Sequence, residues 1–110
     1  MLYVLNSLIV PVDFTEKDHY MVFLKKIVLT EAQEILSEVD FTSAVGHEAT
    51  AKVLSELIGI NISYNRITVK LKSGDMGLHF ALKTRLPEGK VLTEEELKQL
   101  NYEFVLSMIC

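Results

Sequence analysis

Apolar and polar positions alternate along this chain with two different periods, and the two together predict a mixture of helices and strands. Apolar runs at residues 2–5 and 21–29 predict two strands near the start. Further along, residues 67–72 and 78–84 alternate apolar with polar side chains across a glycine-containing turn. This pattern predicts that these two segments pair as an antiparallel hairpin. A last strand is expected over residues 102–108.

The strongest helical pattern covers residues 50–58, where apolar side chains recur at the spacing of one helix face. Gly59 follows as a natural helix end. Two shorter helices are predicted over residues 30–38 and 93–100. Each begins with the residues of a capping box, Thr-Glu-Ala-Gln and Thr-Glu-Glu-Glu.

The expected order of elements is therefore β-β-α-α-β-β-α-β, and a short extra strand near Ile60 is compatible with the pattern. This order predicts an α+β fold with a mixed, largely antiparallel sheet and helices packed on one face. The chain has 110 residues, of which 49% are hydrophobic. These values predict one small domain over residues 1–110.

The sequence contains no apolar run long enough to cross a membrane, so no membrane segment is expected. The first apolar residues lack a basic leader and a small-residue cleavage site, which argues against a signal peptide. Cys110 is the single cysteine and excludes an internal disulfide. These features fit a protein of the reducing cytoplasm.

The formal net charge of −4 argues against a duplex nucleic-acid partner, because non-specific binding to duplexes needs a basic surface. It leaves room for a small anionic ligand in a locally positive site. The chain has no CxxC, HExxH, Walker or GxGxxG motif. Its three histidines show no zinc-ligand spacing, so neither a metal nor a cofactor is expected.

The segment Gly-His-Glu-Ala-Thr at residues 46–50 is the first candidate for chemistry. Extending the apolar stripe of the helix backwards predicts that His47 lies in the first turn and faces inward, away from open solvent. Gly46 lacks a Cβ and would let a ligand approach the backbone. Free N–H groups at a helix start favour an anion. A structural or exposed histidine is the alternative interpretation.

The second candidate is the loop Arg-Leu-Pro-Glu-Gly at residues 85–89. Arg85 could stabilise negative charge on a phosphate in the transition state. Glu88 could orient Arg85 or accept a proton from an attacking hydroxyl. The alternative is a surface ion pair that contributes little.

The remaining polar candidates are weaker on sequence alone. Arg66 opens a predicted strand, and Asn6 and Ser7 end the first one; each is also explained by an exposed position or a turn. His19 lies in a polar stretch. His79 alternates with apolar positions and is predicted to face solvent.

Four blocks of sequence make the chain resemble the viral ring nuclease family, a type III anti-CRISPR family with bacterial and archaeal relatives. The blocks are LYVLN at 2–6, VGHEAT at 45–50, NRITVKL at 65–71 and RLPEGKVL at 85–92. Together they cover nearly the whole chain. The order and spacing of the blocks carry the resemblance more than any one block does.

The resemblance implies a homodimer that binds cyclic tetra-adenylate, the second messenger of type III CRISPR defence. Such enzymes cut the ring without a metal into linear di-adenylates with cyclic phosphate ends, by attack of a ribose 2′-hydroxyl. The family's catalytic histidine, arginine and glutamate match His47, Arg85 and Glu88. Its ring is bound by further residues that match Asn6, Gly46, Thr50 and Arg66.

One departure from the family pattern concerns a serine that viral members often carry shortly after the asparagine block. This chain has Leu8 and Ile9 there, and Ser7 is the candidate to replace that serine. Two other functions stay open: a non-catalytic sponge for cyclic oligoadenylates, and a small interaction protein of a mobile element.

Overall fold

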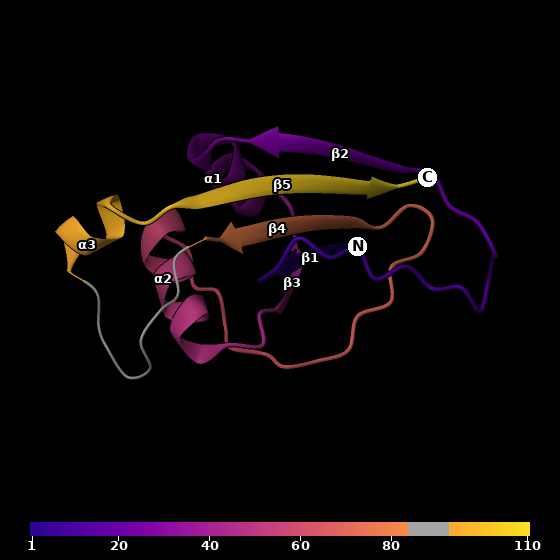
Figure 1. Ribbon diagram of the computed structural model, residues 1–110, viewed down its shortest axis with the longest axis horizontal. Helices are drawn as coiled ribbons and strands as arrows, with labels where there is room; N and C mark the ends of the chain where they lie inside the picture. The colour runs from indigo at the N-terminus through magenta and orange to yellow at the C-terminus, as the bar shows by residue number, and fades with distance from the viewer. Residues whose placement is uncertain (84–92) are drawn as a thin grey trace.

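The computed structural model describes residues 1–83 and 93–110; residues 84–92, which include the candidates Arg85 and Glu88, lie outside the described residues. Five strands form one sheet in the order β2-β5-β4-β1-β3 (Figure 1). The elements in chain order are β1 (Leu2–Leu5), β2 (Val22–Ile27), α1 (Leu29–Glu38), β3 (Phe41–Ala44), α2 (Glu48–Ile58), β4 (Met76–Leu82), α3 (Glu94–Lys98) and β5 (Tyr102–Ile109).

The sheet is mixed, and its two halves differ in strand direction. β1 runs parallel to both β3 and β4. β5 runs antiparallel to β4 and to β2. The α+β class and the mixed sheet predicted from the sequence are confirmed.

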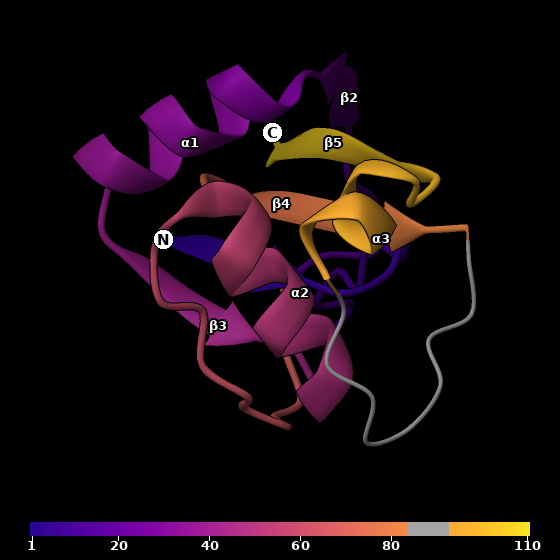
Figure 2. The ribbon, with the colours of Figure 1, turned by 90° about the vertical axis from the view of Figure 1, so that its left-hand side faces the viewer.

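One face of the sheet carries the main apolar core, because α1 and α2 turn their apolar stripes toward it. Helix side chains such as Leu36 and Leu54 pack with Val4, Phe80 and Phe104 of the strands. The three helices lie toward one end of the long axis, the end that faces the viewer in Figure 2. Among the described residues, no helix has the length and apolarity that a membrane span requires.

Extended segments, rather than helices, cover the opposite face. A second apolar cluster joins Ala44 and Ile109 of the sheet to Val69 and Leu71 of the segment before β4. Leu71 also forms an isolated parallel bridge with Val12. Both faces of the central strands are therefore buried.

The predicted hairpin of residues 67–72 with 78–84 is wrong. The only β pairing in 67–72 is the bridge at Leu71, and the neighbours of β4 are β1 and β5. Val69 and Leu71 are 8% and 0% exposed, whereas Ile67 is 45% exposed. The alternation thus reflects an extended segment that buries every second side chain against the sheet without joining its ladder.

The turn before β4 is real, although it closes no hairpin. The Asp75 N–H donates to the Lys72 carbonyl at 2.9 Å. Gly74 has φ 93°, a conformation that glycine adopts without a Cβ penalty.

β3, between the two longer helices, is absent from the predicted order of elements. This strand has four residues, Phe-Thr-Ser-Ala, and shows no clean alternation. The strand allowed near Ile60 is not formed; the nearest pairing is an isolated bridge between Val45 and Tyr64.

Helix ends agree better with the patterns. Gly59 ends α2 in the left-handed region, with φ 79°. The capping box at α3 is confirmed, because the Glu96 N–H donates to Thr93 Oγ1 at 3.2 Å and the Thr93 N–H to Glu96 Oε1 at 3.3 Å. The capping box predicted at Thr30 is wrong: α1 starts at Leu29, and Glu31 accepts from the Val28 N–H at 3.5 Å.

Candidate functional site

The candidate site forms where two parallel strands end together. Leu5 of β1 lies opposite Ala44 of β3, so the residues that follow each strand leave the same edge of the sheet. Asn6 and Ser7 follow β1, and Gly46 and His47 lead from β3 into α2. Ligands of open sheets commonly bind at the carboxyl ends of parallel strands. The fold therefore brings the first two sequence blocks together.

Asn6, Gly46 and Arg66 meet at this edge. The Gly46 N–H donates to Asn6 Oδ1 at 3.4 Å. A Cβ added to Gly46 would lie 3.3 Å from Arg66 Cγ and 3.8 Å from Arg66 Cα. The Arg66 side chain therefore packs directly on the Gly46 backbone, where a Cβ would crowd its Cγ.

Two hydrogen bonds from Asn65 hold Arg66 in place beside the end of β3. The Asn65 N–H donates to the Val45 carbonyl at 2.9 Å, and Asn65 Nδ2 donates to the Ser43 carbonyl at 2.7 Å. The Arg66 side chain is exposed. Arg66 does not open a strand, as predicted, but it stands next to the start of α2, where a guanidinium can meet an anion.

His47 is the N-cap of α2. Its backbone is extended, with φ −133° and ψ 119°. Its Nδ1 accepts the Thr50 N–H at 3.3 Å and lies 3.0 Å from Thr50 Oγ1. Because Nδ1 accepts from a backbone N–H, it holds no proton in this geometry, and the ring proton is on Nε2.

The prediction that His47 faces inward is wrong, since the residue is exposed. The apolar stripe was extended one turn too far. The N-cap residue precedes the helix, and its ring folds back over the first turn to cap it.

Thr50 supports the imidazole of His47 in either protonation state. The residue is 6% exposed. Its hydroxyl can donate to an unprotonated Nδ1 or accept from a protonated one at 3.0 Å. Protonation of Nδ1 gives up the contact from the Thr50 N–H and leaves the hydroxyl as the partner. The predicted contact between Thr50 and a ligand is untested; what the structure shows is a contact with His47.

Ser7 takes part through its backbone. Its side chain is exposed, whereas its carbonyl lies 2.9 Å from His79 Nδ1. The prediction that His79 faces solvent is wrong: it is 0% exposed, and its Nε2 lies 2.8 Å from Ser107 Oγ. Burial lowers the pKa of His79 from the ordinary value of 6.5.

A signal for the burial of His79 was present in the sequence. β4 reads MGLHFAL, with few polar positions. Such a run is typical of a strand covered on both faces. β4 lies between β1 and β5, with helices on one face and extended segments on the other.

Exposed apolar side chains lie next to candidate site residues along the chain. Leu8 and Ile9, directly after Ser7, are 48% and 65% exposed. Tyr64 and Ile67, on either side of Arg66, are 51% and 45% exposed. Clustered exposed apolar side chains are typical of protein contact surfaces.

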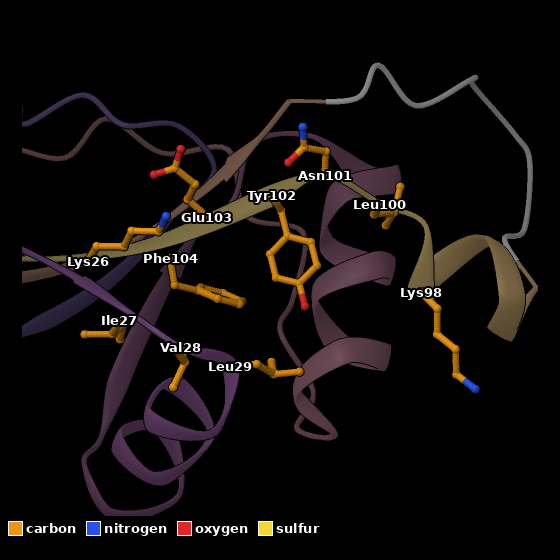
Figure 3. Close-up of a pocket in the computed structure, with 10 residues that line it drawn as sticks. All are labelled: Lys26, Ile27, Val28, Leu29, Lys98, Leu100, Asn101, Tyr102, Glu103 and Phe104. Carbon is orange, nitrogen blue, oxygen red and sulfur yellow. The ribbon is translucent and has the colours of Figure 1, made fainter.

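A hollow of about 350 Å³ lies elsewhere, between the β2–α1 junction and the segment from α3 to β5 (Figure 3). The rings of Tyr102 and Phe104 point into it from β5. None of the candidate site residues within 1–83 lines it. Within residues 1–83 and 93–110, no three His, Cys, Asp or Glu side chains gather in a way that could hold a metal ion.

Taken together, the described site combines an imidazole, a guanidinium and the N–H groups of a helix start. These groups attract a phosphate and can move one proton. The predicted partners Arg85 and Glu88 lie outside the described residues, so their positions relative to His47 stay predictions.

Comparison with known proteins gives consistent matches along the chain. Residues 2–104 match the family model described as STIV B116-like. Protein 26 of Sulfolobus islandicus filamentous virus is 46% identical over 107 residues, covering 96% of this chain and 89% of that protein. YddF of Bacillus subtilis is 36% identical over 104 residues, covering 93% and 91%.

A solved structure shares the fold. B116 of Sulfolobus turreted icosahedral virus superimposes with a TM-score of 0.78, over 97% of each chain, at 24% sequence identity. The match includes the sheet and the helices that position the candidate site. At this identity it supports the architecture alone.

Proposed function

Since the chain belongs to the STIV B116-like family, which includes viral relatives, we propose that it is a metal-independent ring nuclease. Its substrate is cyclic tetra-adenylate, and its products are linear di-adenylates with 2′,3′-cyclic phosphate ends. It acts as a homodimer in the cytoplasm of the host cell. Its effect is to switch off type III CRISPR signalling. This proposal combines the four sequence blocks with the described site.

The observation that carries the proposal is the setting of His47. Its Nδ1 is engaged by Thr50, and the residue is exposed and directly follows Gly46. A histidine that served only as a cap would not require an adjacent glycine with an arginine packed on it. The arrangement supports a group that meets a phosphate ester.

The protein must hold the ribose and the phosphate in line, neutralise the phosphate charge and protonate the leaving oxygen. A ribose 2′-oxygen attacks the adjacent phosphorus, and the bond from phosphorus to the 5′-oxygen breaks. His47, as imidazolium, gives the Nε2 proton to the leaving 5′-oxygen. In that state its Nδ1–H donates to Thr50 Oγ1, which lies 3.0 Å away.

Arg66 contributes a positive charge to the part of the site that the structure describes. Its guanidinium can pair with a phosphate in a bidentate way. In the proposal Arg85 stabilises the transition state, and Glu88 orients it or accepts the 2′-hydroxyl proton. These two roles rest on the sequence resemblance.

The homodimer in the proposal has a physical rationale. Exposed Leu8, Ile9, Tyr64 and Ile67 lie next to site residues along the chain, and a second copy would cover them. A two-fold axis then presents two imidazoles to one ring, so that opposite linkages are cut. It also doubles the arginines that face a tetra-anion, although each chain is acidic overall.

Product analysis tests the proposal directly. The protein is incubated with cyclic tri-, tetra- and hexa-adenylate in the presence of a chelator, and the termini are identified by chromatography and mass spectrometry. We expect the tetramer to yield di-adenylate with a cyclic phosphate. Tight binding without product would instead indicate a sponge. Absence of any ligand-induced rise in Tm would favour an interaction protein.

A further inference from the structure

A buried hydrogen-bonded chain lies beneath the candidate site and links two strands to the Asn6–Ser7 turn. Ser107 of β5 contacts His79 of β4 at 2.8 Å, between Oγ and Nε2. His79 Nδ1 in turn contacts the Ser7 carbonyl at 2.9 Å. Both Ser107 and His79 are 0% exposed.

These contacts fix the tautomer of His79. A carbonyl oxygen can only accept, so Nδ1 carries the proton and donates to Ser7. Nε2 then accepts the Ser107 hydroxyl. Although a serine next to a histidine suggests a nucleophile, neither side chain is exposed, so no substrate can reach the pair.

The pair is built tightly into the sheet. A Cβ added at Gly77 would lie 2.7 Å from His79 Nε2 and 2.7 Å from Ser107 Oγ. The glycine of β4 therefore provides the space that the imidazole occupies. Close packing of this kind holds the ring in one orientation.

Asn6 is consequently held on both sides. Leu5 before it is paired with Ala44 in the sheet, and the carbonyl of Ser7 after it is bound by His79. The side chain of Asn6 then accepts the Gly46 N–H at 3.4 Å, directly before His47. Without the His79 contact, the turn after β1 would lose its one described anchor to β4.

We propose that His79 is a positioning residue for the site, which acts by holding the Ser7 carbonyl and so fixing Asn6 against Gly46. The expected effect on catalysis rests on the proposed function, whereas the expected effect on the Asn6–Gly46 contact is independent of it.

Two substitutions of His79 separate the contributions of its two ring nitrogens. In His79→Asn the amide nitrogen takes the place of Nδ1, which keeps a donor toward Ser7. In His79→Gln the amide nitrogen takes the place of Nε2, which keeps the Ser107 contact and loses Ser7. Gln is closer to His in volume, so a purely structural role predicts the Gln variant to be the better one.

The first readout is the Gly46 amide in the free protein, by its ¹H–¹⁵N resonance and its exchange with solvent. We expect a near-native resonance in His79→Asn, and a shifted, faster-exchanging amide in His79→Gln. An unchanged Gly46 amide in both variants, or the opposite ranking, would overturn the proposal.

The second readout is turnover of cyclic tetra-adenylate. Loss of one hydrogen bond corresponds to a rise in KM of about tenfold for His79→Gln. We expect His79→Asn to stay near the wild-type KM. If the wild type cleaves no ring, the proposed function fails while the Gly46 amide still decides the positioning role.

Ser107→Ala gives a smaller perturbation in case the His79 variants do not fold. It removes the Nε2 partner and leaves the Ser7 contact in place. We expect Gly46 exchange close to that of wild type, as in His79→Asn, because both variants keep the donor toward the Ser7 carbonyl. Clearly faster exchange would overturn the proposal, because the Ser107 contact rather than the Ser7 contact would then hold the Gly46 amide in place.

Discussion

His47 and His79 are two histidines of one small domain with opposite hydrogen-bond roles. At the exposed N-cap of α2, His47 Nδ1 accepts from Thr50. In the buried centre of the sheet, His79 Nδ1 donates to the Ser7 carbonyl. The residue type alone does not decide the role; the partner of Nδ1 does.

The difference has a chemical meaning. Thr50 engages Nδ1 of the exposed His47, so Nε2 is the ring nitrogen that can exchange a proton with a ligand. In His79 both ring nitrogens contact other parts of the protein, so the ring holds the Ser7 carbonyl in place and is not available to a ligand. We therefore expect changes at the α2 start to alter chemistry, and changes in the buried pair to alter stability and positioning.

The largest expected effect follows from removing the imidazole of His47. In His47→Asn the amide can still cap α2, because Asn is a favourable N-cap residue. Loss of the general acid should lower the cleavage rate by about 10²- to 10⁴-fold. Ring binding, measured by calorimetry with cyclic tetra-adenylate, should change little.

Two further variants complete this comparison. His47→Ala should lose the same rate and in addition about 1 kcal/mol of stability, because the cap is gone. His19→Ala should cleave like wild type, since His19 is exposed and contacts Asp18. Normal turnover in His47→Asn would remove His47 from the mechanism.

A second prediction compares the glycines next to the two histidines. Gly77→Ala places a Cβ 2.7 Å from two buried polar atoms, so we expect about 1–3 kcal/mol of destabilisation from overpacking. Gly46→Ala meets Arg66 Cγ at 3.3 Å, and that exposed side chain can move. Its cost should stay within about 0.5 kcal/mol.

Urea unfolding of the two glycine variants measures both values. Equal losses of stability would contradict the distinction between a rigid buried pair and an adaptable surface contact. A change in the urea slope would instead indicate an altered unfolded state.

The sequence predicted those parts of the fold that local patterns determine. The α2 helix with its Gly59 end, the first strand and the α+β class follow from local periodicity and from turn chemistry. The site residues Asn6, Gly46 and Arg66 also came from sequence blocks, and the structure brings these three together. Their shared edge could not be predicted, because it depends on the parallel pairing of β1 with a strand that was missed.

Two of the failures, the hairpin and the exposure of His79, share a physical source. The alternation of a segment reports neither which backbone groups are paired nor what covers the second face of a strand. Val69 and Leu71 are buried by covering the sheet, and His79 is buried because its strand is covered on both faces. In each case the deciding partner is distant in sequence.

The smallest expected effect is a pH dependence of stability that comes from His79. Its folded pKa lies below the ordinary 6.5 because burial disfavours the charged ring. The unfolded chain therefore binds more protons than the folded one as the pH falls below about 6.5, and the free energy of unfolding decreases. This stability is fully present above that pH and is lost as the pH falls toward the lower, folded pKa.

Neutral replacements remove this component, so His79→Asn and His79→Gln should both show a flatter profile than wild type between pH 7 and pH 5. A hydrogen bond from Thr15 lowers the pKa of Asp13 from its ordinary 3.8, and one from Lys83 lowers the pKa of Glu103 from its ordinary 4.5. The contributions of these carboxyls to stability therefore change at more acid pH. Urea midpoints at pH 7.5, 6 and 5 measure the slope. Parallel profiles for wild type and both variants would mean that the buried ring takes up its proton without cost, and the contrast with His47 would then lie in exposure alone.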